Sequence, residues 1–282
     1  MVDLRWVDDI RLMGETDRKA LTDLLASDPV QNLFLLGMLE EHGMGGHDSA
    51  HAFYALPAEG APRAVVLVSR SGLWVPSVPE SRLAQQLGSA LKALPMLSSV
   101  GERAAVDALW ISHGGPARRP RLARLQRLLQ LTPDDMGPWI TSQLRPARPE
   151  DLPQLAEASA LMQRDDLGVD PRGIDAAAHE RRCLERIHTG RSWVLFENGQ
   201  LVFKADVGVR SRWGAQVEGV YTAEGSRHRG IATKGLGQLC RTLLSGLPRL
   251  TLHADAGNEP ALGLYRKLGF TPQRELRLLI SE

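Results

Sequence analysis

One stretch of the chain combines an expected strand end, a glycine-bearing loop and several cations. Val220-Tyr221-Thr222 ends a run of strand-forming residues, and Arg227-His228-Arg229-Gly230-Ile231-Ala232-Thr233 follows at the start of an expected helix. Such a helix start exposes unpaired backbone N–H groups at the positive end of the helix dipole, where a pyrophosphate can bind. Gly230 and Ala232 allow the backbone to approach a ligand closely, and Thr233 offers a hydroxyl to a phosphate oxygen. A basic residue and a glycine also precede many solvated helices, so the loop alone leaves both interpretations open.

The elements around this loop alternate between strand and helix patterns, which indicates an α/β fold. Asn198-Gly199 is a strong hairpin signal between two of the strands. The expected strands of this half are 142–145, 193–196, 201–209, 216–222, 249–254 and 276–280. The expected helices are 149–163, 175–188, 233–245 and 260–268. The loop therefore connects the third strand of this half to a helix.

The first half of the chain has an α/β pattern of its own. Leucines at helical spacing predict paired helices within 17–39, with a break at Asp28-Pro29. Strands are expected at 51–56, 64–69 and 73–75, and helices at 80–94 and 102–111. The prolines at 133, 138, 146, 149 and 153 indicate a connection between domains. We therefore predict one domain at 1–137 and a second at 138–282.

The densest run of charge consists of the arginines at 118, 119, 121, 124 and 127. Leucines at 122, 125, 128 and 129 fall among them at helical spacing. This pattern favours a solvated amphipathic helix, with its leucines facing inward, over a patch for nucleic acid or an acidic substrate.

The composition is that of a soluble globular protein. Of the 282 residues 43% are hydrophobic and 24% charged, and a net charge of +1 gives no global field that would attract nucleic acid or a membrane. Cys183 and Cys240 match no metal-ligand spacing, and we expect both to be reduced and buried. The segment Met1–Trp6 is unlike a signal peptide, and no strongly apolar run near it reaches the ~20 residues of a membrane span. We therefore expect a cytoplasmic protein without a metal site.

A second motif follows the loop, Asn258-Glu259-Pro260-Ala261-Leu262-Gly263-Leu264-Tyr265-Arg266-Lys267-Leu268-Gly269-Phe270. Arg227-x-x-Gly230-x-Ala232 together with Asn258-x-x-Ala261-x-x-Leu264-Tyr265-x-x-x-Gly269-Phe270 resembles the two signatures of the GNAT acetyltransferase superfamily. The resemblance covers about residues 142–282. The first half carries neither motif, but its order of elements is similar to a degenerate GNAT-like domain.

The resemblance implies a fold of two GNAT-like domains, each a mixed, mostly antiparallel sheet flanked by helices. In the C-terminal domain, strands 216–222 and 249–254 would form a splayed parallel pair whose gap admits the pantetheine arm of acetyl-CoA. The backbone of Val220, Tyr221 and Thr222 would line that arm. The pyrophosphate would lie on Arg227, His228, Arg229, Gly230, Ile231, Ala232 and Thr233, with Asn258 and Tyr265 nearer the sulfur.

The resemblance also implies transfer of the acetyl group to a primary amine by direct attack in a ternary complex. Tyr265 would be the general acid, since a phenol with a pKa of about 10 is protonated at neutral pH; a purely packing role is the alternative. Glu218 shares a strand face with residues 220 and 222 and is the candidate general base, directly or through water. It could instead face solvent or bind a cationic substrate. His253 and Asp255 are weaker candidates for the base, and Cys240 is expected in the core.

The identity of the acceptor stays open, because small metabolites, antibiotics, peptide N-termini and protein lysines are all primary amines. A regulatory module that binds acetyl-CoA without turnover and a transferase for longer acyl groups are the alternative functions. The expected partner is the amine substrate, with no nucleic acid and no membrane. A monomer and a homodimer are both compatible with the sequence, since the paired helices at 17–39 could cover the substrate side or form a dimer surface.

Overall fold

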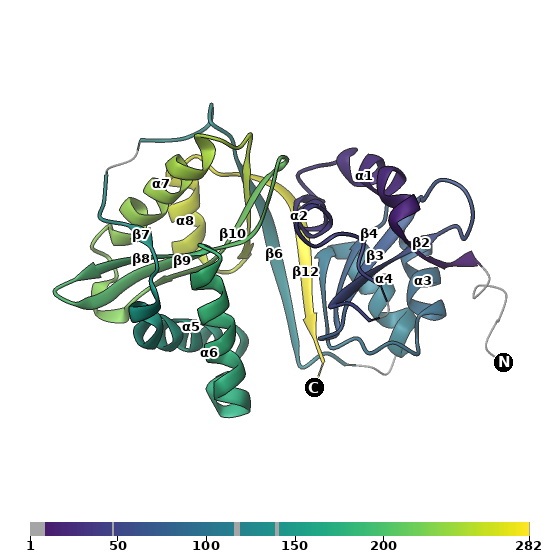
Figure 1. Ribbon diagram of the computed structural model, residues 1–282, viewed down its shortest axis with the longest axis horizontal. Coiled ribbons are helices and arrows are strands. Elements are labelled where there is room, and N and C mark those ends of the chain that lie inside the picture. The colour runs from purple at the N-terminus through teal and green to yellow at the C-terminus, as the bar shows by residue number, and fades with distance from the viewer. Residues whose placement is uncertain (1–8, 47, 116–118, 139–140, 282) are drawn as a thin grey trace. The chain divides into compact units, whose positions relative to one another are not determined.

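The computed structural model describes residues 9–46, 48–115, 119–138 and 141–281 (Figure 1). These residues form two compact units, each built from more than one segment of the chain. The first unit takes in the chain up to Leu129, then His253–Asn258 and the segment from Pro272 onward. The second takes in Gln130–Leu252 and Glu259–Thr271. Two segments that follow residue 138 along the chain therefore pack with the first unit, and the division between 137 and 138 stays a prediction. The predictions for Met1–Trp6 and Arg118 fall outside the described residues.

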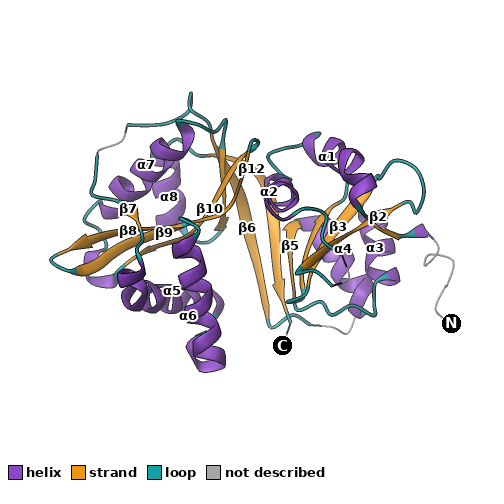
Figure 2. Ribbon diagram, in the orientation of Figure 1, coloured by secondary structure: helices purple, strands orange, loops and turns teal. Residues whose placement is uncertain are grey.

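The first unit is a mixed sheet with helices on its faces (Figure 2). Its helices are α1 (Arg18–Ala26), α2 (Leu33–His42), α3 (Ser81–Ala90) and α4 (Arg103–Gly114). Its strands are β1 (Arg11–Leu12), β2 (His51–Leu56), β3 (Ala64–Ser69), β4 (Leu73–Ser77), β5 (Ser98–Glu102), β6 (Leu122–Leu131) and β12 (Thr271–Ile280), in the order β1-β2-β3-β4-β5-β12-β6. The last two residues of β6 and the first of β12 fall in the second unit. Strands β4 and β5 run parallel, whereas the pairs β1–β2, β2–β3, β3–β4 and β5–β12 are antiparallel.

The core of the first unit is formed in part by side chains that alternate along its strands. All six residues of β2 are buried, so both faces of this strand are covered. Alternate residues of β2, including Tyr54, share one hydrophobic cluster with Trp74 and with the apolar faces of α3 and α4. The two helices approach each other closely, since a Cβ at Gly88 would lie only 2.1 Å from the Oγ of Ser112. The described elements of this half therefore pack around one hydrophobic core.

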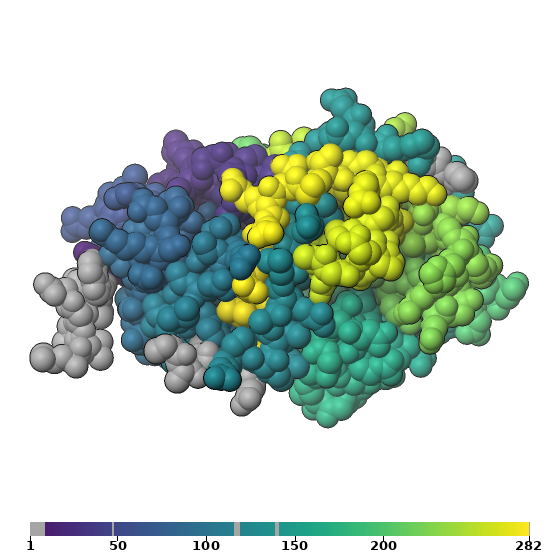
Figure 3. All heavy atoms as spheres, turned by 180° about the vertical axis from the view of Figure 1, so that it is seen from behind, coloured from purple at the N-terminus to yellow at the C-terminus, as the bar shows by residue number. Residues whose placement is uncertain are grey.

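Strand β12 completes the sheet of the first unit although it follows the whole second unit along the chain. It pairs antiparallel with β5, from Leu276 opposite Glu102 to Ile280 opposite Ser98. Leu279 is 5% exposed and belongs to the hydrophobic cluster under α3 and α4. The first half of β12 is exposed, and the yellow C-terminal residues are visible on the surface in Figure 3. The stability of the first unit therefore depends on residues from the far end of the sequence.

We expect Leu279→Ala to destabilise the first unit by about 2–5 kcal/mol, the usual cost of truncating a buried leucine. The test is hydrogen exchange, in which the amides of β2, β3 and β4 should lose protection more than those of the second unit. Glu275→Ala is the control on the same strand, because its carboxylate is 56% exposed and lies 3.4 Å from the guanidinium of Arg103. An exposed ion pair contributes at most about 1 kcal/mol, so this variant should be close to the parent. Equal protection in Leu279→Ala and the parent would contradict the assignment of β12 to this core.

The second unit carries the sequence motifs. Its helices are α5 (Leu152–Leu167), α6 (Arg172–His188), α7 (Ile231–Leu244) and α8 (Glu259–Lys267). Its strands are β7 (Arg145–Pro146), β8 (Ser192–Glu197), β9 (Gln200–Ser211), β10 (Gly214–Thr222) and β11 (Leu250–Asp255), whose last three residues fall in the first unit, in the order β11-β10-β9-β8-β7. Asn198 and Gly199 form the predicted hairpin turn, with φ angles of 50° and 76°.

Strands β10 and β11 are the parallel pair of this unit. They pair at only two positions, Ala215 opposite Leu250 and Gln216 opposite Thr251. The remaining strand pairs, β7–β8, β8–β9 and β9–β10, are antiparallel. The short parallel pairing leaves the second half of β10, which leads into the glycine-bearing loop, without a registered partner on β11.

The segment that contains the leucines of the arginine run, with Arg124 and Arg127, is a strand and not the predicted helix. β6 spans Leu122–Leu131, with Leu128 and Leu129 buried. Leucines three residues apart are typical of a helix. They are also compatible with a strand that has neighbours on both sides, because such a strand can bury side chains on both of its faces. Cys183 and Cys240 are buried and unpaired as expected. Within the described ranges, no helix has both the length and the apolar character needed to cross a membrane.

Candidate active site

The glycine-bearing loop has the geometry that a helix start needs to receive an anion. After β10 ends at Thr222, a short turn leads to His228, with φ +61°, and Gly230, with φ +74°. Gly230 is the N-cap of α7, and no side chain caps the helix from this position. A Cβ at Gly230 would meet no atom within 4 Å, so the space in front of the helix is open. The positive end of this 14-residue helix therefore begins without a side-chain cap, beside open space at Gly230.

The basic side chains of the loop are exposed and already have partners within the second unit. The Nε of Arg227 donates to the carbonyl of Thr222 at 3.3 Å. Arg229 donates to the carboxylate of Glu197 at 2.8 Å. Because both arginines are about half exposed, these contacts are weak enough to be exchanged for a bound phosphate.

The strand before the loop contains a β-bulge. Glu218 lies opposite Asp206 on β9, but Tyr221 lies opposite Lys204, so Gly219 and Val220 together face a single residue. Gly219 has φ +60°, and a Cβ there would lie 2.4 Å from the Oδ2 of Asp206. Only glycine fits this position without displacing a neighbour. The bulge leaves Val220, one of the predicted backbone ligands, without a registered partner on β9.

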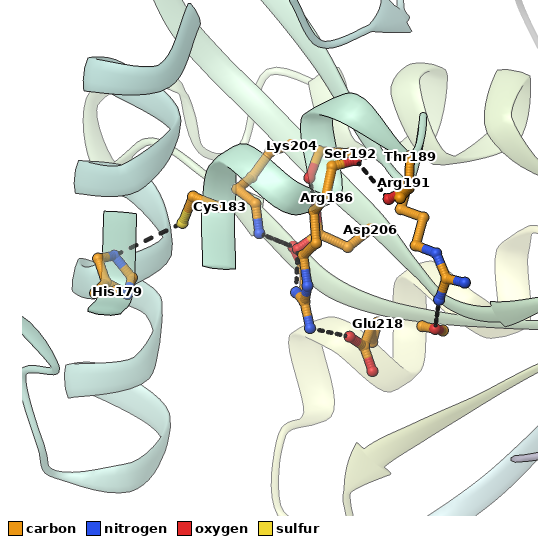
Figure 4. Close-up of polar contacts among 11 residues, drawn as sticks. His179, Cys183, Arg186, Thr189, Arg191, Ser192, Lys204, Asp206 and Glu218 are labelled. Carbon is orange, nitrogen blue, oxygen red and sulfur yellow. Dashed lines mark hydrogen bonds and ion pairs between the residues drawn. The ribbon is translucent and has the colours of Figure 1, made fainter. Parts of the chain in front are cut away.

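Glu218 does not stand alone on its strand face. Its Oε1 accepts a hydrogen bond from Arg186 of α6 at 2.7 Å, and the other arm of the same guanidinium lies 3.1 Å from Asp206 (Figure 4). Asp206 also accepts from Lys204 at 2.6 Å and from the hydroxyl of Ser192 at 2.7 Å. The result is a chain of contacts from the buried strand β9 to the half-buried carboxylate of Glu218.

Tyr265 lies on α8 and is 7% exposed. Its ring contacts that of Phe270 edge to face, with 5.9 Å between the centroids. Burial raises the pKa of its hydroxyl to about 12, and the carboxylate of Asp166 acts in the same direction. The phenol is therefore protonated throughout the neutral range, as a general acid requires.

The weaker candidates are either buried or held in contacts with other side chains. Asp255 is bound by Arg124 at 3.0 Å. His253 is half-buried, and desolvation lowers its pKa to about 4, so it is neutral at pH 7. Cys240 is fully buried, which raises the pKa of its thiol and makes it a poor nucleophile. Asn258 lies in the turn after β11, and its backbone N–H donates to the carbonyl of Asp255 at 3.1 Å.

The low pKa of His253 has a consequence for stability. An unfolded chain binds a proton on this histidine below pH ~6.5, whereas the folded chain does so only near pH 4. The unfolded state therefore binds more protons between these values, and the contribution of His253 to stability falls as pH decreases through this window. We expect His253→Gln to reduce the slope of the free energy of unfolding between pH 6.5 and 4, as measured by urea titration. His188→Gln, at an exposed position, is the control, and equal slopes in both variants would refute the assignment.

The structure places Glu218, Val220, Tyr221 and Thr222 on one strand, and the residues 227–233 after the short turn at Glu224–Ser226 that follows it. Sequence reasoning missed Arg186, Lys204, Asp206 and Ser192. A signal for two of them was present, because Lys204 and Asp206 interrupt the otherwise apolar run Leu201–Val209 two residues apart. Opposite charges on one face of a buried strand have to pair. Among the described residues, no group of His, Cys, Asp or Glu side chains is arranged to hold a metal ion.

Comparison with known proteins identifies one family. Residues 157–270 match the model of the acetyltransferase (GNAT) family. This range contains α6, the hairpin, the bulge, the loop at 227–233 and the motif that ends at Phe270. No curated protein sequence matches the chain.

Solved structures share the fold over almost the whole chain. A GNAT-family acetyltransferase from Colwellia psychrerythraea is 14% identical, with 97% of this chain and 99% of that chain covered and a TM-score of 0.57. A Drosophila protein is 14% identical over 97% and 98% of the two chains, with a TM-score of 0.67. A tandem GNAT protein from the clavulanic acid biosynthesis pathway is 12% identical over 97% and 98%, with a TM-score of 0.56. These likenesses confirm the predicted fold of two GNAT-like domains.

Proposed function

The chain carries a domain of the acetyltransferase (GNAT) family at residues 157–270, and from this premise we propose that it transfers the acetyl group of acetyl-CoA to a primary amine. The observation that carries the proposal is the uncapped start of α7 at Gly230, which follows a strand whose parallel pairing ends after two residue pairs. A helix N-terminus binds the pyrophosphate, and the unpaired strand backbone lines the pantetheine arm.

The proposed cofactor ligands are those expected from the motifs. The loop of Arg227, His228, Arg229, Gly230, Ile231, Ala232 and Thr233 holds the pyrophosphate through backbone N–H groups and exposed cations. Val220, Tyr221 and Thr222 contact the pantetheine arm, and Asn258 lies towards the sulfur. Acetyl-CoA supplies an activated thioester, and its carbonyl is polarised by the backbone N–H of Val220, the residue that the bulge leaves without a registered partner on β9.

The reaction needs two proton transfers and no covalent enzyme intermediate. The amine nitrogen forms a bond to the acetyl carbon while the carbon–sulfur bond breaks, and one proton leaves the nitrogen and one reaches the thiolate. Tyr265 gives its proton to the thiolate, since burial keeps its hydroxyl protonated. Glu218 accepts the proton of the amine directly or through water, with its second oxygen, because Arg186 occupies Oε1.

The remaining features of the function follow from the same proposal. The acceptor is an amine of a small molecule, peptide or protein, and nucleic acid and membrane are not partners. The protein acts in the cytoplasm as a monomer or homodimer. The first unit has a short connection from β4 to α3, residues 78–80, that includes Pro79 and no glycine, which supports a role without acetyl-CoA.

The test combines binding with turnover. Acetyl-CoA at a hundredfold excess over its Kd should stabilise the protein by about 2.7 kcal/mol, measured by calorimetry. A panel of amines should then be screened for thiol release from acetyl-CoA, with propionyl-CoA and butyryl-CoA in parallel to test longer acyl groups. Binding without turnover on any amine would indicate the regulatory alternative, and the absence of binding would refute the proposal.

Glu218→Gln separates a base from a carboxylate that only binds substrate. It retains the shape and a hydrogen bond to Arg186 but cannot take a proton. We expect kcat to fall ~10²-fold or more, with the rising alkaline limb of the pH–rate profile removed. Glu197→Gln, which affects the exposed partner of Arg229, is the control and should retain the profile. A raised KM with an unchanged profile would assign Glu218 to substrate binding.

A further inference from the structure

The network behind Glu218 has features that folding alone does not require. Lys204 is 0% exposed and Asp206 1% exposed, so both charges lie inside the sheet of the second unit. A buried ion pair is weak evidence for stability, because an apolar pair of similar volume is often as stable or more so. Figure 4 shows that the two side chains point towards each other from one face of β9, with Arg186 beyond them.

The contacts of this pair converge on the bulge. The ammonium of Lys204 donates to the carbonyl of Gly219 at 3.0 Å, in addition to Asp206. Gly219 is the left-handed residue that makes β10 bulge, and Val220 follows it. Through Arg186, Asp206 also reaches the carboxylate of Glu218. The carbonyl of Gly219 and the carboxylate of Glu218 are thus both connected to one buried charge pair.

We propose that Lys204 and Asp206 are positioning residues for acetyl transfer, which fix the bulge at Gly219 so that the N–H of Val220 is directed at the thioester carbonyl. Lys204 holds the Gly219 carbonyl by a hydrogen bond. This carbonyl and the N–H of Val220 belong to one trans peptide group and point in opposite directions, so fixing the carbonyl also fixes the direction of the N–H. Asp206 fixes Lys204 and, through Arg186, orients Glu218. The inference rests on the proposed function, since it assigns a task to the amide that faces the acetyl group.

The variant that tests it replaces the pair by apolar side chains of similar size. Lys204→Met with Asp206→Leu removes both charges, and Ser192→Ala removes the buried hydroxyl that would otherwise lose its acceptor. The matched control, Arg145→Gln with Asp151→Asn, removes another ion pair of the second unit, with 2.6 Å between its charged atoms. Urea unfolding of both establishes that each is folded.

The readout is the carbonyl stretch of acetyl-CoA labelled with ¹³C at the thioester carbon, measured by infrared difference spectroscopy on the full chain. Binding to the parent should shift this band to lower frequency, because a hydrogen bond polarises the carbonyl. The triple variant should bind acetyl-CoA with a Kd within about threefold of the parent but lose at least half of the shift. The control should retain both.

The possible outcomes distinguish a failure of the positioning role from a failure of the proposed function. A folded triple variant with the full shift would overturn the positioning role while leaving the proposed function intact. If the parent itself does not bind acetyl-CoA, the proposed function fails and the inference fails with it. Gly219→Ala gives an independent check, because its Cβ would lie 2.4 Å from Asp206 and 2.9 Å from Lys204. It should reduce the shift in the parent background, and an unchanged shift would also contradict the proposal.

Discussion

Replacing Tyr265 with phenylalanine should lower kcat by ~10²–10⁴ while leaving the affinity for acetyl-CoA within a few-fold of the parent. The ring keeps its place against Phe270, with the hydroxyl as the single group removed. Without this proton donor the thiolate has to leave as an anion or take its proton from water. The measurement is steady-state turnover with an amine from the screening panel, together with calorimetric binding of acetyl-CoA.

The matched control is Tyr54→Phe, which removes a hydroxyl of similar burial from the core of the first unit. Tyr54 is 8% exposed, and burial also raises the pKa of its hydroxyl. It lies on β2, in the unit that has no cofactor motif. A parent with robust turnover that Tyr265→Phe leaves unchanged would remove Tyr265 from the chemistry, and the cofactor assignment would still stand.

The second large effect concerns Gly230→Asp, which should weaken acetyl-CoA binding roughly a hundredfold. The new carboxylate would stand where the pyrophosphate is expected, and two charges about 5 Å apart repel by about 3 kcal/mol at an effective dielectric constant near 20. Aspartate tolerates a left-handed backbone better than most residues, and a Cβ at this position meets no atom within 4 Å. The fold should therefore be retained, which thermal unfolding without ligand can verify.

Gly230→Asn isolates the charge from the shape. Asparagine has nearly the same size as aspartate and also accepts φ values near the +74° of Gly230. We expect it to weaken binding by less than tenfold, so that the difference between the two variants measures the negative charge alone. Equal affinity of Gly230→Asp and the parent in calorimetry would place the pyrophosphate elsewhere.

Local sequence patterns were sufficient for most elements of the second unit. The Asn198-Gly199 turn, the strand before the loop and the helix after it all follow from short-range preferences that the structure satisfies. The bulge at Gly219 did not follow from them, because a glycine in a strand is compatible with several irregularities. Its position depends on the register between β9 and β10, and register is a property of two strands together.

The features that the sequence did not reveal depend on long-range pairing. The segment Leu122–Leu131 has leucines at helical spacing, and only its neighbours in the sheet make it a strand. The pairing of β12 with β5 could not be predicted for the same reason, since no local signal indicates it. Arg186 was likewise not identifiable from its helix, because its partners Asp206 and Glu218 lie on two different strands.

The pairing of β12 with β5 also sets an order of events during synthesis. Glu102 and Leu276, which lie opposite each other, are 174 positions apart in the chain. At about 5–20 residues per second, a ribosome needs roughly 10–35 s to reach the second of them after the first. Throughout that interval the edge of β5 that later pairs with β12 has no partner, although the apolar residues of the first half have already been translated. Unpaired strand edges can pair with other chains. We therefore expect the edge of β5 in the nascent first unit to stay uncovered, and open to chaperones or aggregation, until the second unit and β12 have been translated.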